Sequence, residues 1–393
     1  MRICAVTPYP PPASGVGDYG ELMAAELTRH PRVDSITVLA DRGAGLGGQG
    51  AARIVDVRRA WSRDALIPTE LVRQIERLRP DVVWFNFGLT MFGTRPLSVL
   101  SGLSLPLLVK LLGYPVVVTL HEMPALADLA SLAIPRLRGR VAGWAAMRLL
   151  LCADEVIVTL DRYRRHLGAR HRAGNVTHIP HGLWRRPEPL AEADGASVLV
   201  FGTFGPHKDP RLVLDAVRRI RRRARRVRLL VAGTDHPRFP GFMARLAPQL
   251  EGDDEWAGYV PAGALPALFG RATLVVVPST ASTGSSGVIH RAVGHARPVV
   301  VSDLPDFRAL AAEEGLALAW ASPGDAAALA AAIDELLEDR ALRDRLVAHN
   351  MRAAARLSPE RTAESYLRVF AGVRSRSTAP LPSAASIPTR VEA

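Results

Sequence analysis

The chain has 393 residues, of which 48% are hydrophobic and 22% charged, and its formal net charge is +12. This length exceeds what one hydrophobic core usually holds, so two domains are expected of an otherwise ordinary globular composition. The two cysteines, Cys4 and Cys152, exclude a disulfide framework, and neither stands in a metal-ligand spacing.

The densest basic stretch is RRIRRRARRVR at 218–228. Val213, Val217, Ile220 and Ala224 fall at helical spacing before and within it, which predicts a helix with one buried face and a solvated arginine face. No aromatic residues are interleaved with these arginines, so we do not expect nucleic acid as a partner. A basic surface also attracts anionic lipid headgroups, and that alternative stays open.

The N-terminal segment MRICAVTPYPPP has too short an apolar run for a secretory signal and is interpreted as a first strand. The longest apolar stretch, 96–120, is interrupted by Pro106, Lys110 and Pro115, so no membrane span is predicted. We therefore expect a cytoplasmic protein, with peripheral association at the inner membrane face as the remaining alternative.

Short runs rich in Val, Ile and Leu alternate with helical patterns along the chain. Such runs are typical of parallel strands that are buried on both faces. They are expected at 2–6, 36–40, 82–86, 116–120, 155–159, 176–180, 197–201, 228–232, 273–277, 298–302 and 316–320. Because they form two series, the sequence predicts an α/β fold with two Rossmann-like, doubly wound parallel-sheet domains that face a cleft.

Proline, charged and small residues replace the periodic pattern at 183–197, which marks the domain seam. We therefore predict one domain at 1–185 and a second at 186–357. A capped helix is expected at 358–373, packing back toward the N-terminal domain. The segment 374–393 is rich in Pro, Ser and Ala and is expected to be a disordered tail.

Lysine is rare, because only Lys110 and Lys208 are lysines among the 50 Lys and Arg residues. The strand expected at 197–201 is followed by Gly202 and Thr203, which are candidate donor contacts together with Lys208, and a helix start comes after the loop. Lys208 therefore stands at the carboxyl end of a parallel strand, where open α/β sheets bind their ligands. Its ammonium suits phosphate oxygens, and a surface lysine beside a helix cap is the alternative.

The strand expected at 273–277 leads into a loop of small residues, TASTGSSG, and then into a short helix at roughly 288–296. Free backbone N–H groups at such a helix start, beside the positive end of its dipole, form a phosphate-binding cradle. A plain flexible loop is the alternative. The candidate ligand contacts are Thr283, Gly284, Ser285, Ser286, Gly287 and Val288.

Glycines and histidines mark three further stretches. Gly15 and Gly17 lie between the first strand and the first helix, where glycine permits positive φ and close ligand approach, or only a tight turn. His121 directly follows a buried strand, where it could hydrogen-bond a sugar hydroxyl, stabilise developing charge or be structural. His178 and His181 point to opposite faces of an expected strand, so no metal site is predicted.

The segments GVGDYGELMAAEL, TLHE, ADEVIVTLDRYRRHL, THIPHG, FGTFGPHKD and RPVVVSD follow one another in an order that resembles the retaining glycosyltransferases of family 4. The likeness runs from residue 1 to about 373 and implies a two-domain GT-B fold. It implies that the N-terminal domain binds the acceptor and that the C-terminal domain binds a nucleotide sugar. The implied reaction moves a sugar to a hydroxyl acceptor, a cell-envelope glycan or secondary metabolite, with retention and without a metal or other cofactor.

Four candidate residues match positions of this family. Lys208 matches the lysine that holds the donor diphosphate, and His121 matches the histidine near the donor sugar. Gly15 and Gly17 match the N-terminal glycine loop that faces donor and acceptor. The resemblance therefore implies His121 and Lys208 as catalytic residues.

The chain departs from the family pattern at three positions. Thr203 stands where the family usually has an arginine, and Thr283 and Arg291 stand where it usually has two glutamates. Arg291, one helical turn after Gly287, is our candidate for the diphosphate charge that Thr203 does not supply. A GT-B scaffold that binds nucleotide sugar without turnover is the main alternative. A sugar-nucleotide epimerase would require carboxylates in the cleft that the sequence does not place.

Overall fold

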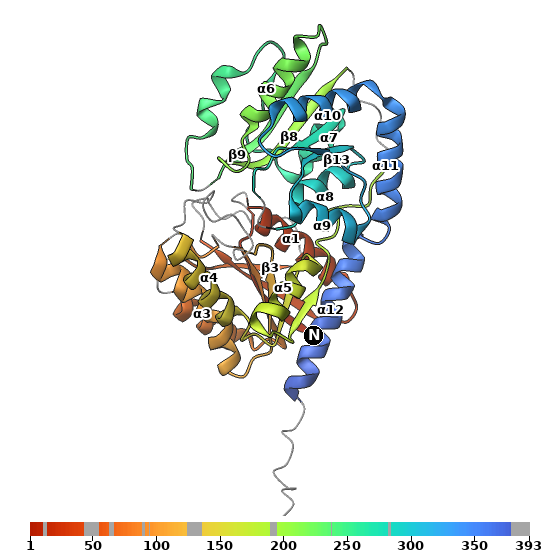
Figure 1. Cartoon of the computed structure of the whole chain (residues 1–393). Helices are drawn as coiled ribbons and strands as arrows, with labels where there is room; N and C mark the ends of the chain where they lie inside the picture. Colours follow the sequence, from red (N-terminus) through yellow and green to blue (C-terminus); the bar gives the residue numbers. More distant parts are fainter. Residues whose placement is uncertain are drawn as a thin grey trace, which may run out of the picture.

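The computed structural model describes residues 1–10, 14–42, 55–62, 67–88, 91–93, 95–123, 136–188, 195–236, 238–281 and 284–378. Within them the chain forms two parallel sheets with helices packed against them, one domain above the other in Figure 1. The prediction of two doubly wound α/β domains is confirmed.

The first sheet has seven parallel strands in the order β3-β2-β1-β4-β5-β6-β7. They are β1 (Arg2–Val6), β2 (Ser35–Asp41), β3 (Asp56–Trp61), β4 (Val82–Phe87), β5 (Val116–Leu120), β6 (Glu155–Val158) and β7 (Val176–His178). The helices are α1 (Gly15–Thr28), α2 (Ile67–Leu78), α3 (Pro96–Leu111), α4 (Arg136–Leu150) and α5 (Asp161–His171). The order reverses between β1 and β4, so the segments that follow β1, β4 and β5 meet at one sheet edge.

The second sheet has six parallel strands in the order β10-β9-β8-β11-β12-β13. They are β8 (Ser197–Phe204), β9 (Arg228–Asp235), β10 (Glu255–Trp256), β11 (Leu274–Val277), β12 (Val299–Ser302) and β13 (Ala319–Ala321). The helices are α6 (Pro210–Arg221), α7 (Leu265–Gly270), α8 (Gly287–Gly294), α9 (Pro305–Glu314), α10 (Ala326–Glu338) and α11 (Arg340–Ala354), with short 3-10 turns at Met243–Arg245, Ala247–Gln249 and Ala262–Ala264. Because β8 and β11 are neighbours, the loops after them lie together.

Apolar sequence and burial agree at the centre of both sheets. Every residue of β4, β5, β11 and β12 is buried, as expected where helices cover both faces of a sheet. On one face of the first sheet, Tyr19 and Met23 of α1 and Tyr366 of α12 (Pro359–Thr378) pack with Trp84 of β4. This packing fixes the start of α1 against the carboxyl end of the sheet.

Two strands were not predicted, and one is misplaced. β3 reads DVRRAW, and β10 has only two residues, so neither presents the apolar run that marked the other strands. β3 is an edge strand, where charged side chains can face water. The last strand is shifted from 316–320 to β13, because only its last residues pair with β12.

Helix α12 descends from the second domain along the first (Figure 1), and it ends later than predicted. The tail predicted from 374 onward is wrong for 374–378, which are the last turn of α12. Val373 is buried, and Arg376 forms an ion pair with Glu155 at 3.0 Å, so both hold that turn against the first domain. The remainder of the predicted tail, 379–393, lies outside the described residues.

Candidate functional site at the domain interface

The Lys208 ammonium turns back onto the end of β8 from the loop that precedes α6. Its Nζ donates a hydrogen bond to the Phe201 carbonyl oxygen at 2.9 Å, and no carboxylate of the described chain forms an ion pair with it. Burial lowers the pKa of Lys208 to about 8, so most of the side chain is charged at pH 7. A half-buried cation held by a neutral carbonyl is suited to an incoming anion.

Two glycines make room for this ammonium. Gly202 has a φ of +129°, and a Cβ there would lie 2.6 Å from Lys208 Nζ and 3.3 Å from Val288 Cγ2. Gly233 of β9 has a φ of +142°, and its Cβ would lie 1.7 Å from the Gly202 carbonyl oxygen. A side chain at position 202 would clash with Lys208, and the positive φ also favours glycine there. Lys208 and Val288 approach each other over Gly202. Thr203 follows within β8, in register with β9.

The small-residue loop after β11 opens α8 as the sequence predicted, although the helix ends earlier, at Gly294. Ser286 is the N-cap residue, and its Oγ accepts a hydrogen bond from the Ile289 amide at 3.4 Å. Val288, in the first turn of α8, lies close to Gly202 in β8. The first free amides of α8 therefore lie beside this part of β8. Thr283 lies outside the described residues.

The same loop touches the N-terminal domain. Gly284 pairs with Glu122 in an antiparallel backbone bridge, and a Cβ on Gly284 would lie 2.0 Å from the His121 carbonyl oxygen. Only glycine fits at this distance, because real Cβ atoms do not approach a carbonyl so closely. The carboxyl end of β5 and the start of α8 therefore form one interface between the domains.

Two buried polar groups at this interface have no hydrogen-bond partner within the part of the chain that the structure describes. They are Ser285 Oγ and Trp184 Nε1. Gly287 lies close to Trp184, since a Cβ on Gly287 would be 3.9 Å from Trp184 Cζ2. A buried polar group without a partner costs about 1–3 kcal/mol. A bound ligand with polar atoms would remove that cost.

The two N-terminal glycines differ from expectation. Gly15 and Gly17 belong to the first turn of α1, not to a loop before it, and neither has positive φ. Ser14 caps the helix by accepting a hydrogen bond from the Gly17 amide at 3.3 Å. A Cβ on Gly17 would lie 3.2 Å from the Pro8 carbonyl, whereas one on Gly15 would meet nothing within 4 Å. Close packing therefore explains Gly17, and no contact of this structure explains Gly15.

Arg291 joins the domains through a carboxylate that sequence reasoning missed. One Nη donates to Asp18 Oδ2 at 2.7 Å, and the guanidinium carbon lies 3.7 Å from the centre of the Trp184 ring. It also lies 5.9 Å from the Phe201 ring, whose backbone carbonyl holds Lys208. Burial lowers the pKa of Arg291 and raises that of Asp18, while the ion pair opposes both shifts. The candidate diphosphate cation is thus already neutralised.

His121 is a neutral imidazole in a buried network. Its Nε2 lies 2.6 Å from Asn86 Oδ1, and the Asn86 amide nitrogen donates to Thr7 Oγ1 at 2.9 Å and to the Val16 carbonyl at 2.8 Å. Because that amide nitrogen is the donor, Asn86 Oδ1 must accept from His121 Nε2–H, which leaves Nδ1 as an acceptor. Burial lowers the pKa of His121 to about 4. His121 can therefore accept a hydroxyl hydrogen bond, but it carries no positive charge at pH 7.

Two further histidines, His181 and His290, contact each other across the interface, and His181 also contacts His121. His181 stacks on His290 with ring centres 4.7 Å apart, and His290 Nε2 lies 2.8 Å from Glu314 Oε2. Burial alone lowers the pKa of His290, but Glu314 and the Ser286 carbonyl outweigh it, so the net shift is upward. Burial lowers the pKa of His181. The hydrogen-bonded pair of His290 and Glu314 lies within the second domain, and His290 Nδ1 lies 2.9 Å from the carbonyl oxygen of Ser286, the N-cap residue of α8.

Most of the predicted site residues are thus brought together around Phe201, Gly202 and Gly284. The partners that the sequence did not reveal are Asp18, Asn86, Trp184, His290 and Glu314. Asp18 was visible within the GVGDYG segment, directly after Gly17, as an acidic residue at a helix start. Within the described chain, no group of three or more His, Cys, Asp or Glu side chains is arranged to hold a metal ion. None of its helices is both long and apolar enough to cross a membrane.

Two facing parallel-sheet domains, with a cation and a helix start at the carboxyl ends of the strands, define the GT-B fold. Residues 195–339 match the family model described as glycosyl transferases group 1. This segment contains Lys208, Arg291 and the small-residue loop. No curated protein matches the chain by sequence.

Solved GT-B structures are similar over nearly the whole chain. HepE from Anabaena, in complex with UDP and glucose, is 18% identical with a TM-score of 0.69, over 95% of this chain and 100% of that one. Sucrose-phosphate synthase from Thermosynechococcus elongatus is 17% identical with a TM-score of 0.72, over 96% and 100%. WaaG, a glycosyltransferase involved in lipopolysaccharide biosynthesis, is 13% identical with a TM-score of 0.64, over 95% and 100%. At these identities the likeness establishes the fold.

Proposed function

We propose that the protein is a retaining glycosyltransferase that moves a sugar from a nucleotide-diphosphate donor to a hydroxyl acceptor, in a cell-envelope glycan or a secondary metabolite. The match of residues 195–339 to group 1 glycosyltransferases supports this activity. The neighbour HepE, solved with UDP and glucose, supports a nucleotide-sugar donor. The observation that carries the proposal is that the half-buried Lys208 ammonium and the start of α8 lie close together over Gly202.

Lys208 and the backbone amides at 284–288 stabilise the departing diphosphate. The ammonium exchanges the Phe201 carbonyl for phosphate oxygens, a charge-assisted bond that is stronger than the neutral one it replaces. The α8 amides add donors that point at the same charge. Because this charge grows as the sugar–phosphate bond breaks, both groups bind the transition state more tightly than the ground state.

Transfer proceeds on one face of the sugar without a covalent enzyme intermediate. The bond between the anomeric carbon and the phosphate oxygen breaks, and a bond to the acceptor oxygen forms on the same face. The acceptor proton passes to the departing phosphate oxygen. Arg291 supplies a second positive charge once it releases Asp18, so charge neutralisation requires no metal or other cofactor. His121 orients the donor sugar by accepting a hydroxyl hydrogen bond at Nδ1.

A thermal-shift screen against UDP-, GDP-, ADP- and dTDP-sugars tests donor binding, because a ligand that binds the folded state raises its melting temperature. Release of the free nucleoside diphosphate by the purified protein then tests turnover. Binding and turnover that both disappear in Lys208→Met support the proposal. The absence of any stabilising nucleotide sugar would contradict it.

A non-catalytic GT-B scaffold is the second candidate. The observation that favours it is the Arg291–Asp18 ion pair, which occupies the charge that would otherwise face the donor. A scaffold predicts a thermal shift with a nucleotide sugar but no release of nucleoside diphosphate with any acceptor. The two measurements above therefore separate the alternatives.

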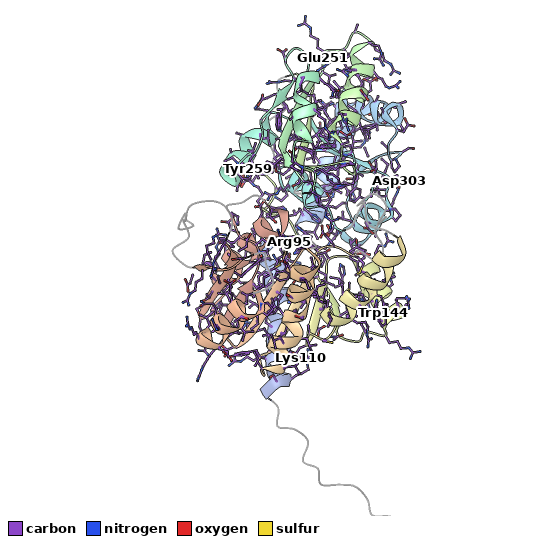
Figure 2. All side chains as sticks on the ribbon, turned by 90° about the vertical axis from the view of Figure 1, so that its left-hand side faces the viewer. Arg95, Lys110, Trp144, Glu251, Tyr259 and Asp303 are labelled. Atoms are coloured by element: carbon purple, nitrogen blue, oxygen red, sulfur yellow. The ribbon has the colours of Figure 1, made fainter. Side chains whose placement is uncertain are left out.

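We further propose that the protein works at the cytoplasmic membrane surface. Leu97, Leu100 and Leu111 of α3 are 71%, 56% and 75% exposed, and Trp144 of α4 is 47% exposed. Figure 2 looks onto this face, with Arg95, Lys110 and Trp144 labelled. Exposed leucines near Arg95 suit an anionic lipid surface, whereas Lys110 on the same face is already paired with Asp154. Cosedimentation with phosphatidylglycerol vesicles should be lost in Leu97→Ser/Leu100→Ser, and equal binding by that variant would overturn this location.

A further inference from the structure

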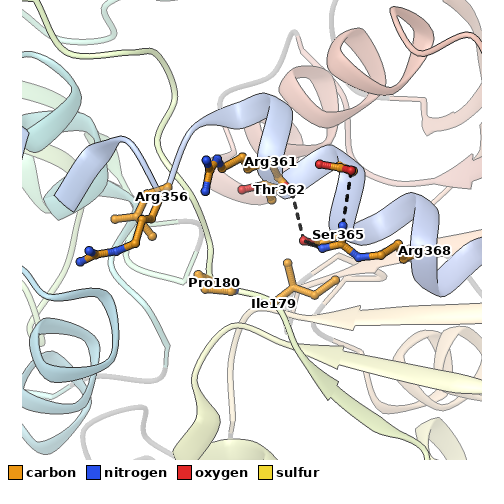
Figure 3. A pocket seen from close by; sticks show the side chains of 9 residues that line it. Ile179, Pro180, Arg356, Arg361, Thr362, Ser365 and Arg368 are labelled. Carbon is orange, nitrogen blue, oxygen red and sulfur yellow. Dashed lines mark hydrogen bonds and ion pairs between the residues drawn. The ribbon is translucent and has the colours of Figure 1, made fainter. Parts of the chain in front are cut away.

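A pocket of about 350 Å³ lies where the chain crosses twice between the domains, and neither Lys208 nor Arg291 lines it. Ile179 and Pro180, which follow β7, form one side of it, and the start of α12 forms the other (Figure 3). The two crossings are joined by a hydrogen bond from the Leu183 amide to the Leu357 carbonyl at 2.7 Å. The volume is within the range of small-molecule sites.

Three arginines line this pocket, and two of them are not neutralised. Arg368 lies 3.6 Å from the Glu364 carboxylate and donates to Ser365 Oγ at 2.8 Å (Figure 3). Neither Arg356 nor Arg361 forms an ion pair with any residue that the structure describes. The pocket therefore holds two uncompensated positive charges.

This lack of partners distinguishes the pocket from the most basic stretch of the sequence. At 218–228, five of the eight arginines are paired with carboxylates of neighbouring elements: Arg218 with Glu251, Arg221 with Asp254, Arg223 with Asp334, Arg225 with Glu338, and Arg228 with Glu255. An adjoining pocket of about 540 Å³ shares Arg368, but its own Arg376 is paired with Glu155 at 3.0 Å. A high density of arginines is therefore not by itself evidence of an anion-binding site. Arginines that line a pocket and have no carboxylate partner are better evidence.

The lining of the pocket is mainly polar at its surface and rests on a tightly packed base. Ile179 and Leu357 are each 4% exposed. Gly182 has a φ of +75°, and a Cβ there would lie 2.2 Å from Thr362 Oγ1, so the crossing chain packs tightly against α12. This tight packing fixes the backbone on both sides of the pocket, while the exposed side chains of Arg356 and Arg361 stay accessible to an anion from solvent.

We infer that this pocket binds a phosphate-bearing small molecule, separate from the donor site. A guanidinium presents its N–H groups in a planar fork that matches two phosphate oxygens. Two such groups balance the charge of a phosphate dianion. The ligand would contact both crossings, through Arg356 and Arg361 on one side and Pro180 on the other.

Calorimetric titration with inorganic pyrophosphate tests this site against the donor site. The wild-type protein, the double variant Arg356→Gln/Arg361→Gln and the variant Lys208→Met are compared. Arg352→Gln, an exposed arginine of α11 outside the pocket, is the matched control. We expect the pyrophosphate affinity of one site to fall at least about tenfold in the double variant. Lys208→Met and Arg352→Gln should keep the wild-type affinity at that site.

A vesicle arm identifies the source of the phosphate. If wild-type protein binds phosphatidylcholine vesicles containing phosphatidylglycerol, but not pyrophosphate, and the double variant loses that binding, the phosphate belongs to a lipid headgroup. Pyrophosphate binding that depends on Arg356 and Arg361 assigns a soluble ligand. The site would be overturned if wild-type protein bound neither pyrophosphate nor the vesicles, or if the binding that it shows were unchanged by the double substitution at an unchanged melting temperature. Because Lys208→Met tests the donor site and the double variant tests this pocket, the pocket result can be interpreted even if the donor proposal fails.

Discussion

The two cations at the domain interface are held by different partners. Lys208 donates to a backbone carbonyl of its own domain, whereas Arg291 bonds the Asp18 carboxylate of the other domain and lies on the Trp184 ring. An incoming diphosphate has only a neutral acceptor to replace at Lys208, but a charged one at Arg291. The partner that a cation must release, rather than its position alone, therefore sets its contribution to anion binding.

Removing the Lys208 charge should have the largest effect. We expect Lys208→Met to lower kcat/KM for the donor by about 10² to 10³, the usual result of deleting one group that stabilises developing negative charge. Lys110→Met is the matched control, since the other lysine of the chain forms a surface ion pair with Asp154 at 2.8 Å. Steady-state kinetics measure the change. Equal losses in both variants would mean that Lys208 has no special role.

The pH dependence of donor binding separates the two cations further. Burial lowers the pKa of Lys208 to about 8, so deprotonation above that pH removes its charge, while arginine stays protonated. Donor affinity should fall about tenfold per pH unit above pH 8 in the wild type. Calorimetry between pH 7 and pH 9.5 measures the slope. Arg291→Met should keep this slope and Lys208→Met should lose it, and a slope retained without Lys208 would refute the assignment.

Removing the Arg291 charge should have a smaller effect than removing that of Lys208. Arg291→Met keeps an unbranched stem over Trp184 but leaves the Asp18 carboxylate unpaired beside the diphosphate. We expect donor binding to weaken about tenfold, within the range of a single charge-assisted hydrogen bond. The dissociation constant is measured by calorimetry at pH 7. An unchanged constant would show that Arg291 serves only to join the domains.

The sequence predicted the half of the site that depends on local rules. Lys208 at the end of β8 and the small-residue loop before α8 follow from buried strands and helix caps, which are local patterns. Gly202 was proposed as a donor contact, and the structure adds that it makes room for Lys208.

The other half depends on contacts that no local pattern encodes. Asp18 and Arg291 are 273 residues apart and meet only because the domains face each other. His290 and Glu314 are 24 residues apart on different helices, so their burial as a pair depends on how α8 packs against α9. β3 was missed because a charged edge strand lacks the apolar run that identified the central strands.

Neutralising Asp18 gives the smallest expected effect, and its sign is opposite to the others. Asp18→Asn removes the carboxylate that competes with the diphosphate for Arg291, so donor binding should tighten about threefold to tenfold. Glu26→Gln is the control, because Glu26 lies two turns further along α1 and pairs with Arg29. Calorimetry at low ionic strength measures both variants. Weaker binding in Asp18→Asn alone would mean that the ion pair organises Arg291 for the donor instead of withholding it.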